Sequence, residues 1–186
     1  MTAIEIAGAA ITVLSIWLAA RQNVWYYPTG LVSVVMYAWI YLQARLYAEA
    51  GLQVVWFALM IYGWYQWLYG GAHQSELHVS RTPRGAWPAV VSAGLMLSLL
   101  VAYLQYRYTD NPAPLVDSTI AAFSIVAQAM TAKKWLESWL FWIVINVVAV
   151  ALYLERGLYP TAVLYAMLFV LGIKGFIEWR RSLASV

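Results

Sequence analysis

The sequence predicts an all-α integral membrane protein with seven membrane-spanning helices. Hydrophobic residues make up 64% of its 186 residues and charged residues 10%, whereas a soluble domain is about 45–50% apolar. The apolar residues gather in seven stretches that approach the ~20 residues a helix needs to cross the hydrocarbon core of a bilayer. Trp, Tyr and basic residues mark the ends of several stretches, as in the interfacial belts of membrane proteins. We therefore expect a multi-pass protein embedded in the lipid bilayer.

The seven spans follow one another at short intervals, and the first begins near the N-terminus. Residues 1–10 contain Glu5 and no basic residue. They therefore lack the positively charged start of a cleavable signal peptide and are expected to open the first span. Aromatic belt residues are expected at Trp25, Tyr26 and Tyr27, at Trp67 and Tyr69, and at Trp179. The predicted spans are residues 4–20, 29–44, 52–69, 88–106, 115–131, 138–154 and 159–179.

Lys and Arg are distributed unequally between the two ends of these spans. The end shared with the N-terminus carries three of them, Arg45, Arg107 and Arg156. The opposite end carries seven, which are Arg21, Arg81, Arg84, Lys133, Lys134, Arg180 and Arg181. Because basic loops are retained in the cytoplasm, we expect an outside N-terminus and a cytoplasmic C-terminus.

The sequence contains an internal repeat. One constant shift of the chain on itself, here termed the repeat offset, aligns Tyr41 with Tyr153, Gly63 with Gly175, and Trp67 with Trp179. This predicts two three-helix repeats, at residues 1–70 and 113–186, joined by a polar loop and one linker helix at residues 71–112. A single linker helix lets both repeats insert in the same orientation, so they are parallel. A site is then expected on the axis between them, near the middle of the membrane.

The sixth span carries the first candidate site residues. Trp139, Trp142 and Asn146 fall at i, i+3 and i+7, which confines two indoles and one carboxamide to an arc of about 60° on one helix face. Flat aromatic walls and an amide suit a ring-shaped polar solute. An unpaired amide in hydrocarbon costs about 1–3 kcal/mol. Helix packing, with Asn146 bonded to a neighbouring helix, is the alternative.

Three further spans contribute candidates. One stripe of the third span forms a candidate cavity wall of Gln53, Trp56, Met60, Trp64 and Trp67. Shifting this stripe by the repeat offset gives a second wall that begins at Tyr165 in the seventh span. Gln128 lies inside the fifth span, and an amide present in only one repeat favours a ligand over symmetric packing. We expect one asymmetric site, in which Gly30 leaves room opposite Trp142; interhelical packing is the alternative.

The charged residues near the spans are expected to have structural roles. Lys174 lies close to the end of the seventh span, where it can extend to the membrane surface and pair with Glu178 at i+4. Glu5 and Asp117 occupy equivalent positions in the two repeats, which favours capping of a first helical turn, with proton coupling as the alternative. The sequence has no nucleotide-binding loop, catalytic triad or metal-ligand cluster, so no enzyme activity, cofactor or metal is predicted. The net charge of +3 does not point to a nucleic acid partner.

Three stretches of the sequence resemble the Pnu family of bacterial vitamin transporters. They are residues 46–67, with YGWYQW, residues 117–128, and residues 137–159, with the family pattern W-x-x-W-x-x-x-N as Trp139, Trp142 and Asn146. The resemblance implies that these three residues face the substrate together with Gln53 and Gln128. It also implies a three-plus-one-plus-three arrangement like that of the SWEET sugar transporters, a homotrimer, and facilitated diffusion in which a cytoplasmic kinase traps the vitamin for NAD biosynthesis.

The sequence departs from the nicotinamide riboside transporters of this family at two positions. Met60 stands where Asn is frequent, and Lys174 where Asn or an apolar residue is usual. We predict a facilitator in the bacterial inner membrane that carries a small aromatic vitamin by alternating access. Aromatic walls with no basic residue nearby suit a cation, which favours nicotinamide riboside and thiamine over riboflavin. Nicotinamide riboside is the predicted substrate, with thiamine or riboflavin as alternatives. A membrane interaction protein that transports nothing is the other class considered.

Overall fold

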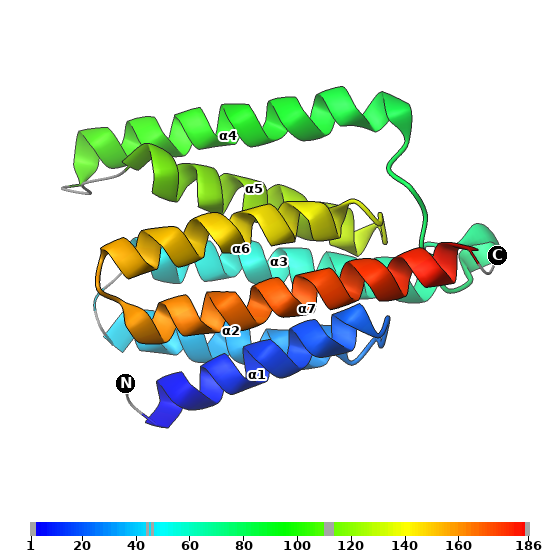
Figure 1. Cartoon of the computed structure of the whole chain (residues 1–186), viewed down its shortest axis with the longest axis horizontal. Helices are drawn as coiled ribbons and strands as arrows, with labels where there is room; N and C mark the ends of the chain where they lie inside the picture. Colours follow the sequence, from blue (N-terminus) through cyan, green and yellow to red (C-terminus); the bar gives the residue numbers. More distant parts are fainter. Residues whose placement is uncertain (1–2, 44, 46, 110–113, 185–186) are drawn as a thin grey trace.

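The computed structural model describes residues 3–43, 45, 47–109 and 114–184, and this part of the chain is almost entirely helical (Figure 1). Its helices are α1 (Ala3–Ala20), α2 (Tyr26–Gln43), α3 (Tyr47–Tyr69), α4 (Trp87–Tyr108), α5 (Pro114–Ala132), α6 (Ser138–Glu155) and α7 (Tyr159–Ala184). Two short 3-10 turns, η1 (Ala72–Gln74) and η2 (Arg84–Ala86), interrupt the linker. Each predicted span corresponds to one of these helices. Leu46 and the unit boundary expected at residues 112 and 113 lie outside the described residues.

Helix ends differ from the predicted spans where the helix continues beyond its apolar stretch. α2 begins at Tyr26 rather than residue 29, with Pro28 tolerated in its first turn because the first N–H groups of a helix have no intrahelical partner. α3 begins five residues earlier than predicted, and α7 continues to Ala184 rather than ending at residue 179. Arg181 in the last turn of α7 is favourable because it meets the negative end of the helix dipole.

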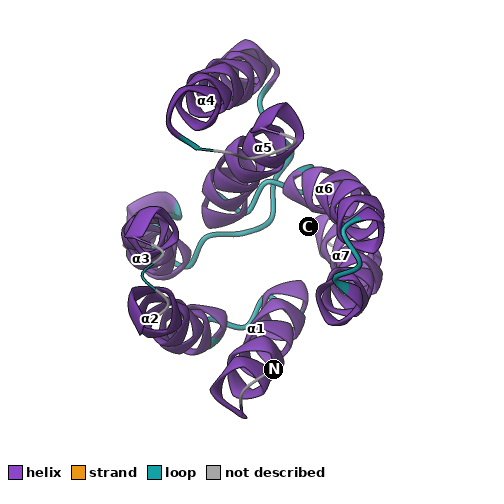
Figure 2. Ribbon diagram, turned by 90° about the vertical axis from the view of Figure 1, so that its left-hand side faces the viewer, coloured by secondary structure: helices purple, strands orange, loops and turns teal. Residues whose placement is uncertain are grey.

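The helices are arranged as a ring with one helix outside it (Figure 2). α1, α2 and α3 pack in chain order, and so do α5, α6 and α7. The ring closes because α3 packs against α5 and α7 packs against α1, while α4 packs on α5 from outside. The turns after α1, α3 and α5 and the end of α7 lie at the same end of the ring, here termed the basic end because seven Lys and Arg residues cluster there.

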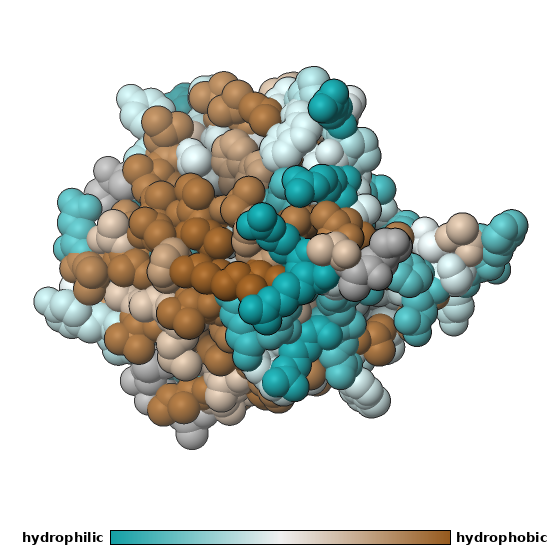
Figure 3. Space-filling view, turned by 45° about the vertical axis from the view of Figure 1, so that its right-hand side comes forward, coloured by the Kyte–Doolittle hydropathy of each residue, from teal (hydrophilic) through white to brown (hydrophobic). Residues whose placement is uncertain are grey.

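The surface of the ring is suited to lipid. Four segments are long and apolar enough to cross a membrane, namely Arg84–Tyr108, Pro114–Ala132, Ser138–Glu155 and Tyr159–Ala184, and Ile4–Ala20 is a shorter apolar helix. α2 and α3 are of similar length, but their Tyr, Trp and Gln side chains lower their hydropathy. Hydrophobic residues cover much of the helix surface and hydrophilic residues gather toward one end (Figure 3). The chain is a multi-pass helical membrane protein.

The polar linker is fixed across the basic end. Its residues 77–82, the linker strap, form a short bridge with the turn between α5 and α6. The Ser80 N–H donates to the Lys134 carbonyl at 3.0 Å, and the Leu136 N–H donates to the Ser80 carbonyl at 2.9 Å. Val79 is buried in the same core as the aromatic residues of the basic end. The linker, predicted only as a polar loop, therefore connects the end of α3 with the start of α6.

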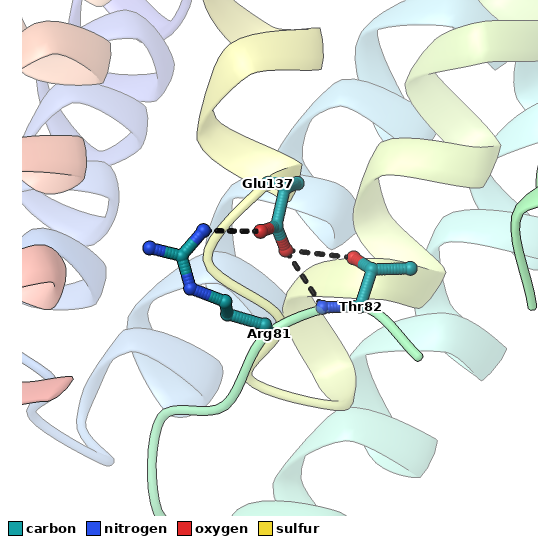
Figure 4. A network of polar contacts seen from close by, with 3 residues as sticks. All are labelled: Arg81, Thr82 and Glu137. Carbon is teal, nitrogen blue, oxygen red and sulfur yellow. Dashed lines mark hydrogen bonds and ion pairs between the residues drawn. The ribbon is translucent and has the colours of Figure 1, made fainter. Parts of the chain in front are cut away.

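A carboxylate holds the end of the strap. Glu137 Oε2 accepts hydrogen bonds from the backbone N–H of Thr82 at 2.7 Å and from its hydroxyl at 2.8 Å (Figure 4). Arg81 Nη1 lies 3.8 Å from Glu137 Oε1. Because the Arg81 side chain is 70% exposed, this ion pair adds little, and the two hydrogen bonds of Thr82 carry the attachment.

Candidate functional site

The predicted face of α6 does turn toward the interior of the ring. Trp139 is 2% exposed and Asn146 is 4% exposed. Trp142 is partly buried, and its Nε1 donates to the Thr131 hydroxyl of α5 at 3.1 Å. Among the residues described, the Asn146 carboxamide has no hydrogen-bond partner. The alternative in which Asn146 bonds a neighbouring helix therefore finds no support in the described contacts.

Gln128 joins three helices at the centre of the ring. This α5 residue is 1% exposed. Its Oε1 accepts a hydrogen bond from the Tyr26 hydroxyl of α2 at 2.9 Å, and its Nε2 faces the Met60 thioether of α3 at 3.7 Å. A thioether is a weak acceptor, so the carbonyl of Gln128 is well satisfied and its N–H donors are not.

The space expected beside Gly30 is filled by Met60. A Cβ at Gly30 would lie 2.7 Å from the Met60 methyl group, so a larger residue at this position would require the Met60 side chain to shift. The expectation that Gly30 leaves room opposite Trp142 is therefore corrected: in the structure a flexible side chain from α3 takes that room. Met adapts readily to irregular spaces, so Met60 is able to move aside for a ligand.

A row of four rings closes the interior at the basic end. This aromatic row runs Tyr27, Trp67, Trp179, Trp139, with ring-centroid distances of 5.1, 5.8 and 5.4 Å. The outer two contacts are edge-to-face, at 90° and 87°, a favourable geometry for aromatic pairs. The row is part of the main buried core of the protein.

Two indoles of the row bind the ends of neighbouring helices. Trp67 Nε1 donates to the Thr131 carbonyl at 3.0 Å, which links α3 to the end of α5. Trp179 Nε1 donates to the Ala19 carbonyl at 3.0 Å, which links α7 to the end of α1. The same two carbonyls also accept a backbone N–H in the turn that follows each helix, Thr131 from Lys134 at 3.0 Å and Ala19 from Gln22 at 2.9 Å, so each indole gives its carbonyl a second hydrogen bond.

The structure corrects the placement of several aromatic residues. Tyr26, Tyr27, Trp67 and Trp179 were expected in the interfacial belt, yet each is at most 2% exposed, because all four pack between helices at the basic end. Trp25, at 63% exposed, does lie at the surface. Two features of the sequence indicated an interior role. Trp67 belongs to the stripe predicted as a candidate cavity wall, and the repeat offset relates Trp67 to Trp179 and Gly63 to Gly175.

A basic residue also lies closer to the aromatic residues than expected. Lys134 Nζ is 4.5 Å from the centroid of the Trp67 ring, and Lys134 as a whole is 7% exposed. Burial lowers the pKa of its ammonium group, and the nearby carboxylate of Glu76 opposes this effect. The expectation of aromatic walls without a nearby basic residue is therefore wrong at the basic end.

The remaining predicted residues divide between two levels of the ring. Trp64 packs against the same core as Trp142 and Met60. Gln53 and Trp56 are partly buried on α3, and no hydrogen bond or ring contact of either is found within the described residues. Gln53 is seven residues from Met60, about 10 Å along the helix.

Tyr165 occupies the level farther from the basic end. Its ring stacks on that of Tyr153 at a centroid distance of 5.2 Å, which pairs α7 with α6. The predicted site residues thus fall into two groups along the ring. The group near the basic end, here termed the deep group, consists of Trp139, Trp142, Trp64 and Gln128. The other group lies farther from the basic end, toward the end of the ring where α1 begins (the N-terminal end), and consists of Asn146, Gln53, Trp56 and Tyr165.

The charged residues near the spans are paired. Lys174 Nζ lies 3.9 Å from Glu178 Oε1 on the same helix, as expected from their spacing. Arg156 Nη2 lies 2.8 Å from Asp117 Oδ2 and links the outer ends of α6 and α5. In the part of the chain that is described, no group of three or more His, Cys, Asp or Glu residues could hold a metal ion.

A hollow of about 600 Å³ lies away from these residues, between α5 and α6. Its lining includes Thr119, Phe123, Phe141 and Val144 and is almost wholly apolar. Such a lining suits lipid chains rather than a polar solute. This groove was not predicted from the sequence, because it follows an outer face of both helices.

The fold and the site together define a class of protein. A multi-pass helical membrane protein whose indole and carboxamide side chains point into the interior of a ring of helices has the features of a transporter for small ring-shaped solutes. Residues 2–181 match the model of the family described as nicotinamide mononucleotide transporter, and the chain belongs to this family. The family resemblance predicted from the sequence is thereby confirmed.

Curated relatives and a solved structure agree with this membership. The chain is 31% identical to the nicotinamide riboside transporter PnuC of Escherichia coli, over 96% of this chain and 85% of that protein. It is 26% identical to the riboflavin/roseoflavin transporter RibM of Streptomyces davaonensis, over 94% and 83%. The crystal structure of the vitamin B3 transporter PnuC has the same fold, with a TM-score of 0.75, 22% identity and coverage of 96% and 80%.

Proposed function

We propose that this protein is a facilitator that carries nicotinamide riboside across the bacterial inner membrane. The observation that carries the proposal is the interior set of Trp142, Asn146 and Gln128 in a chain 31% identical to a nicotinamide riboside transporter. Nicotinamide riboside combines a cationic aromatic ring, a carboxamide and a ribose. Indole faces attract such a cation, and carboxamide side chains bind amide and hydroxyl groups.

The two levels of the ring suit the two parts of this substrate. The deep group offers the Trp142 indole, already oriented by Thr131, and the Gln128 amide. Asn146, Gln53 and Tyr165 are nearer the N-terminal end, where a ribose would extend. The amide of Asn146, without a partner among the described residues, has donors and an acceptor available for ribose hydroxyls.

The transport mechanism we propose is alternating access between two parallel three-helix repeats, α1–α3 and α5–α7, joined by α4. Backbone features that recur at the repeat offset support it. Both ends of α2 (Tyr26–Gln43) are related by this offset to the ends of α6 (Ser138–Glu155). Residues with a left-handed backbone conformation also correspond at this offset, Gln22 to Lys134 and Arg45 to Gly157.

Side-chain contacts recur in the same way. Tyr27 packs against Gly63 as Trp139 packs against Gly175. The indole bond from Trp67 to Thr131 has its counterpart in the bond from Trp179 to Ala19. Rocking of one repeat against the other around a central site is the expected motion.

The remaining elements of the proposal concern the cellular setting. The distribution of Lys and Arg supports an outside N-terminus and a cytoplasmic C-terminus. Family resemblance alone supports a homotrimer and trapping of the vitamin by a cytoplasmic kinase on the way to NAD. A reporter that is active only in the cytoplasm is expected to be active when fused to the C-terminus, and an inactive fusion would contradict the orientation.

Riboflavin is the second candidate substrate. The 26% identity to RibM favours it, and its isoalloxazine ring would also stack on indoles. Uptake of labelled nicotinamide riboside, riboflavin and thiamine into proteoliposomes distinguishes them. We expect saturable uptake of nicotinamide riboside that equilibrates without an ion gradient. Uptake of all three no faster than in protein-free vesicles would contradict a transport function and favour a membrane interaction protein.

A further inference from the structure

We infer that Tyr26 is a positioning residue that fixes the Gln128 amide so that its N–H donors face the substrate. The protein would then select a ring that carries a carbonyl oxygen at this point. This inference rests on the proposed transport function but adds a residue from the other half of the chain. Tyr26 and Gln128 are 102 residues apart in sequence and belong to helices in opposite halves of the ring.

The geometry leaves the amide one favourable orientation. The Tyr26 hydroxyl is 2.9 Å from Gln128 Oε1, and both residues are 1% exposed. The opposite side of the amide faces the Met60 sulfur, which has no proton to donate. A flipped amide would present its N–H donors to the Tyr26 hydroxyl, which would then accept a hydrogen bond and leave its own proton without the acceptor it has at Gln128 Oε1. It would also turn its carbonyl toward a sulfur that cannot donate, and unsatisfied buried polar groups are unfavourable.

The fixed orientation has a consequence for recognition. Gln128 Nε2 has two N–H donors, and among the described residues its recorded partner is the weakly accepting Met60 sulfur at 3.7 Å. A ligand carbonyl oxygen is a stronger acceptor than a thioether. A substrate that displaces the Met60 side chain and presents a carbonyl oxygen therefore gains a hydrogen bond, whereas one that presents an N–H or amino group meets like donors.

Tyr27 provides a matched control within the same helix. It is as deeply buried as Tyr26, yet its hydroxyl has no hydrogen-bond partner among the described residues. Tyr26→Phe removes the hydroxyl that holds Gln128, and Tyr27→Phe removes a hydroxyl that holds nothing described. Both variants keep the ring and its packing, so a general effect of losing a buried hydroxyl would occur in both.

The experiment compares binding of nicotinamide riboside with that of pyridinium riboside, which has the same sugar and cationic ring but no carboxamide. Wild type is expected to bind nicotinamide riboside about tenfold more tightly than pyridinium riboside, because one hydrogen bond to a buried donor changes affinity by about this factor. Tyr26→Phe should reduce this preference at least threefold, mainly by weakening nicotinamide riboside. Tyr27→Phe should leave the preference unchanged.

The outcomes separate the two proposals. If Tyr26→Phe weakens both ligands equally, or if Tyr27→Phe alters the preference as much, the positioning role is wrong while the transport function stands. If wild type binds riboflavin instead, the proposed substrate is wrong. Riboflavin has ring carbonyls, so the positioning role of Tyr26 then requires that Tyr26→Phe weaken riboflavin binding and that Tyr27→Phe leave it unchanged. If wild type binds none of these ligands, both proposals fail.

Discussion

The ring centroids of Trp67 and Trp179 lie 5.8 Å apart at the basic end of the ring. Each indole donates its N–H to a carbonyl at the end of a helix in the opposite half. The two bonds have equal lengths of 3.0 Å. Neither residue is equivalent to a lipid-facing belt residue, although both end an apolar span. They connect α3 to α5 and α7 to α1, the two contacts that close the ring.

Replacing either indole by a phenyl ring should destabilise the protein by a similar amount. Trp67→Phe and Trp179→Phe each remove one hydrogen bond to a helix-end carbonyl, worth about 1 kcal/mol in a membrane protein. We expect each to lower the Tm in detergent by about 2–4 °C, measured by thermal unfolding. Trp25→Phe, at an exposed position, is the control. Destabilisation by only one of the two interior variants would contradict their equivalence.

Asn146→Leu should weaken substrate binding without weakening the fold. The Asn146 amide has no hydrogen-bond partner among the described residues, so a leucine of similar size loses no described contact. Loss of one ligand hydrogen bond would reduce affinity about tenfold, measured by titration of the purified protein. Val147→Leu, on the adjacent outward face, should change neither affinity nor Tm. Unchanged affinity in Asn146→Leu would remove this residue from the site.

Glu137→Gln should loosen the linker strap. The charged acceptor of two Thr82 hydrogen bonds becomes a neutral amide, and charge-assisted bonds are about twice as strong as neutral ones. Local opening of the strap then exposes the peptide bonds that follow Arg81 and Arg84. Trypsin should therefore cleave the variant at these peptide bonds several times faster than it cleaves wild type. Glu155→Gln, an exposed carboxylate at the other end of the ring, serves as control. Equal cleavage rates in all three proteins would contradict the role of Glu137.

Lys134 should make stability depend on alkaline pH. Burial lowers the pKa of its ammonium group in the folded protein. Between this lowered pKa and the ordinary value for lysine, the unfolded chain binds more protons than the folded protein, so this residue contributes increasing stability as pH rises. The Tm of wild type should therefore rise relative to that of Lys134→Met as the pH rises toward the ordinary pKa of lysine. A difference in Tm that stays constant over this range would contradict the prediction.

Hydropathy and helical spacing were sufficient to predict the seven helices and one wall of the candidate site. Every apolar stretch became a helix because apolar runs of this length bury their backbone in no other way within lipid. The face that carries Trp139 and Asn146 follows from helical geometry alone and is buried as expected. The partly buried Trp142 lies on the same face.

Partners across the ring could not be predicted in the same way. Tyr26 at the start of a span fits a lipid interface and a buried core equally well, and only its packing against Trp67 of α3 and its bond to Gln128 of α5 decide between them. Its bond to Gln128 spans 102 residues, a separation that no local pattern encodes. The bridge from Ser80 to Trp135 likewise joins two segments without periodicity.

The reciprocal indole bonds also limit how often the basic end can open. A motion that separates α3 from α5 and α7 from α1 there breaks both bonds, because one crosses each contact. At about 1 kcal/mol for each bond, the two together would hold an open conformation to a few per cent of the molecules unless a ligand compensates. Differential affinity of the substrate for the two conformations, rather than tight binding itself, then determines how far the substrate shifts the protein toward the open conformation.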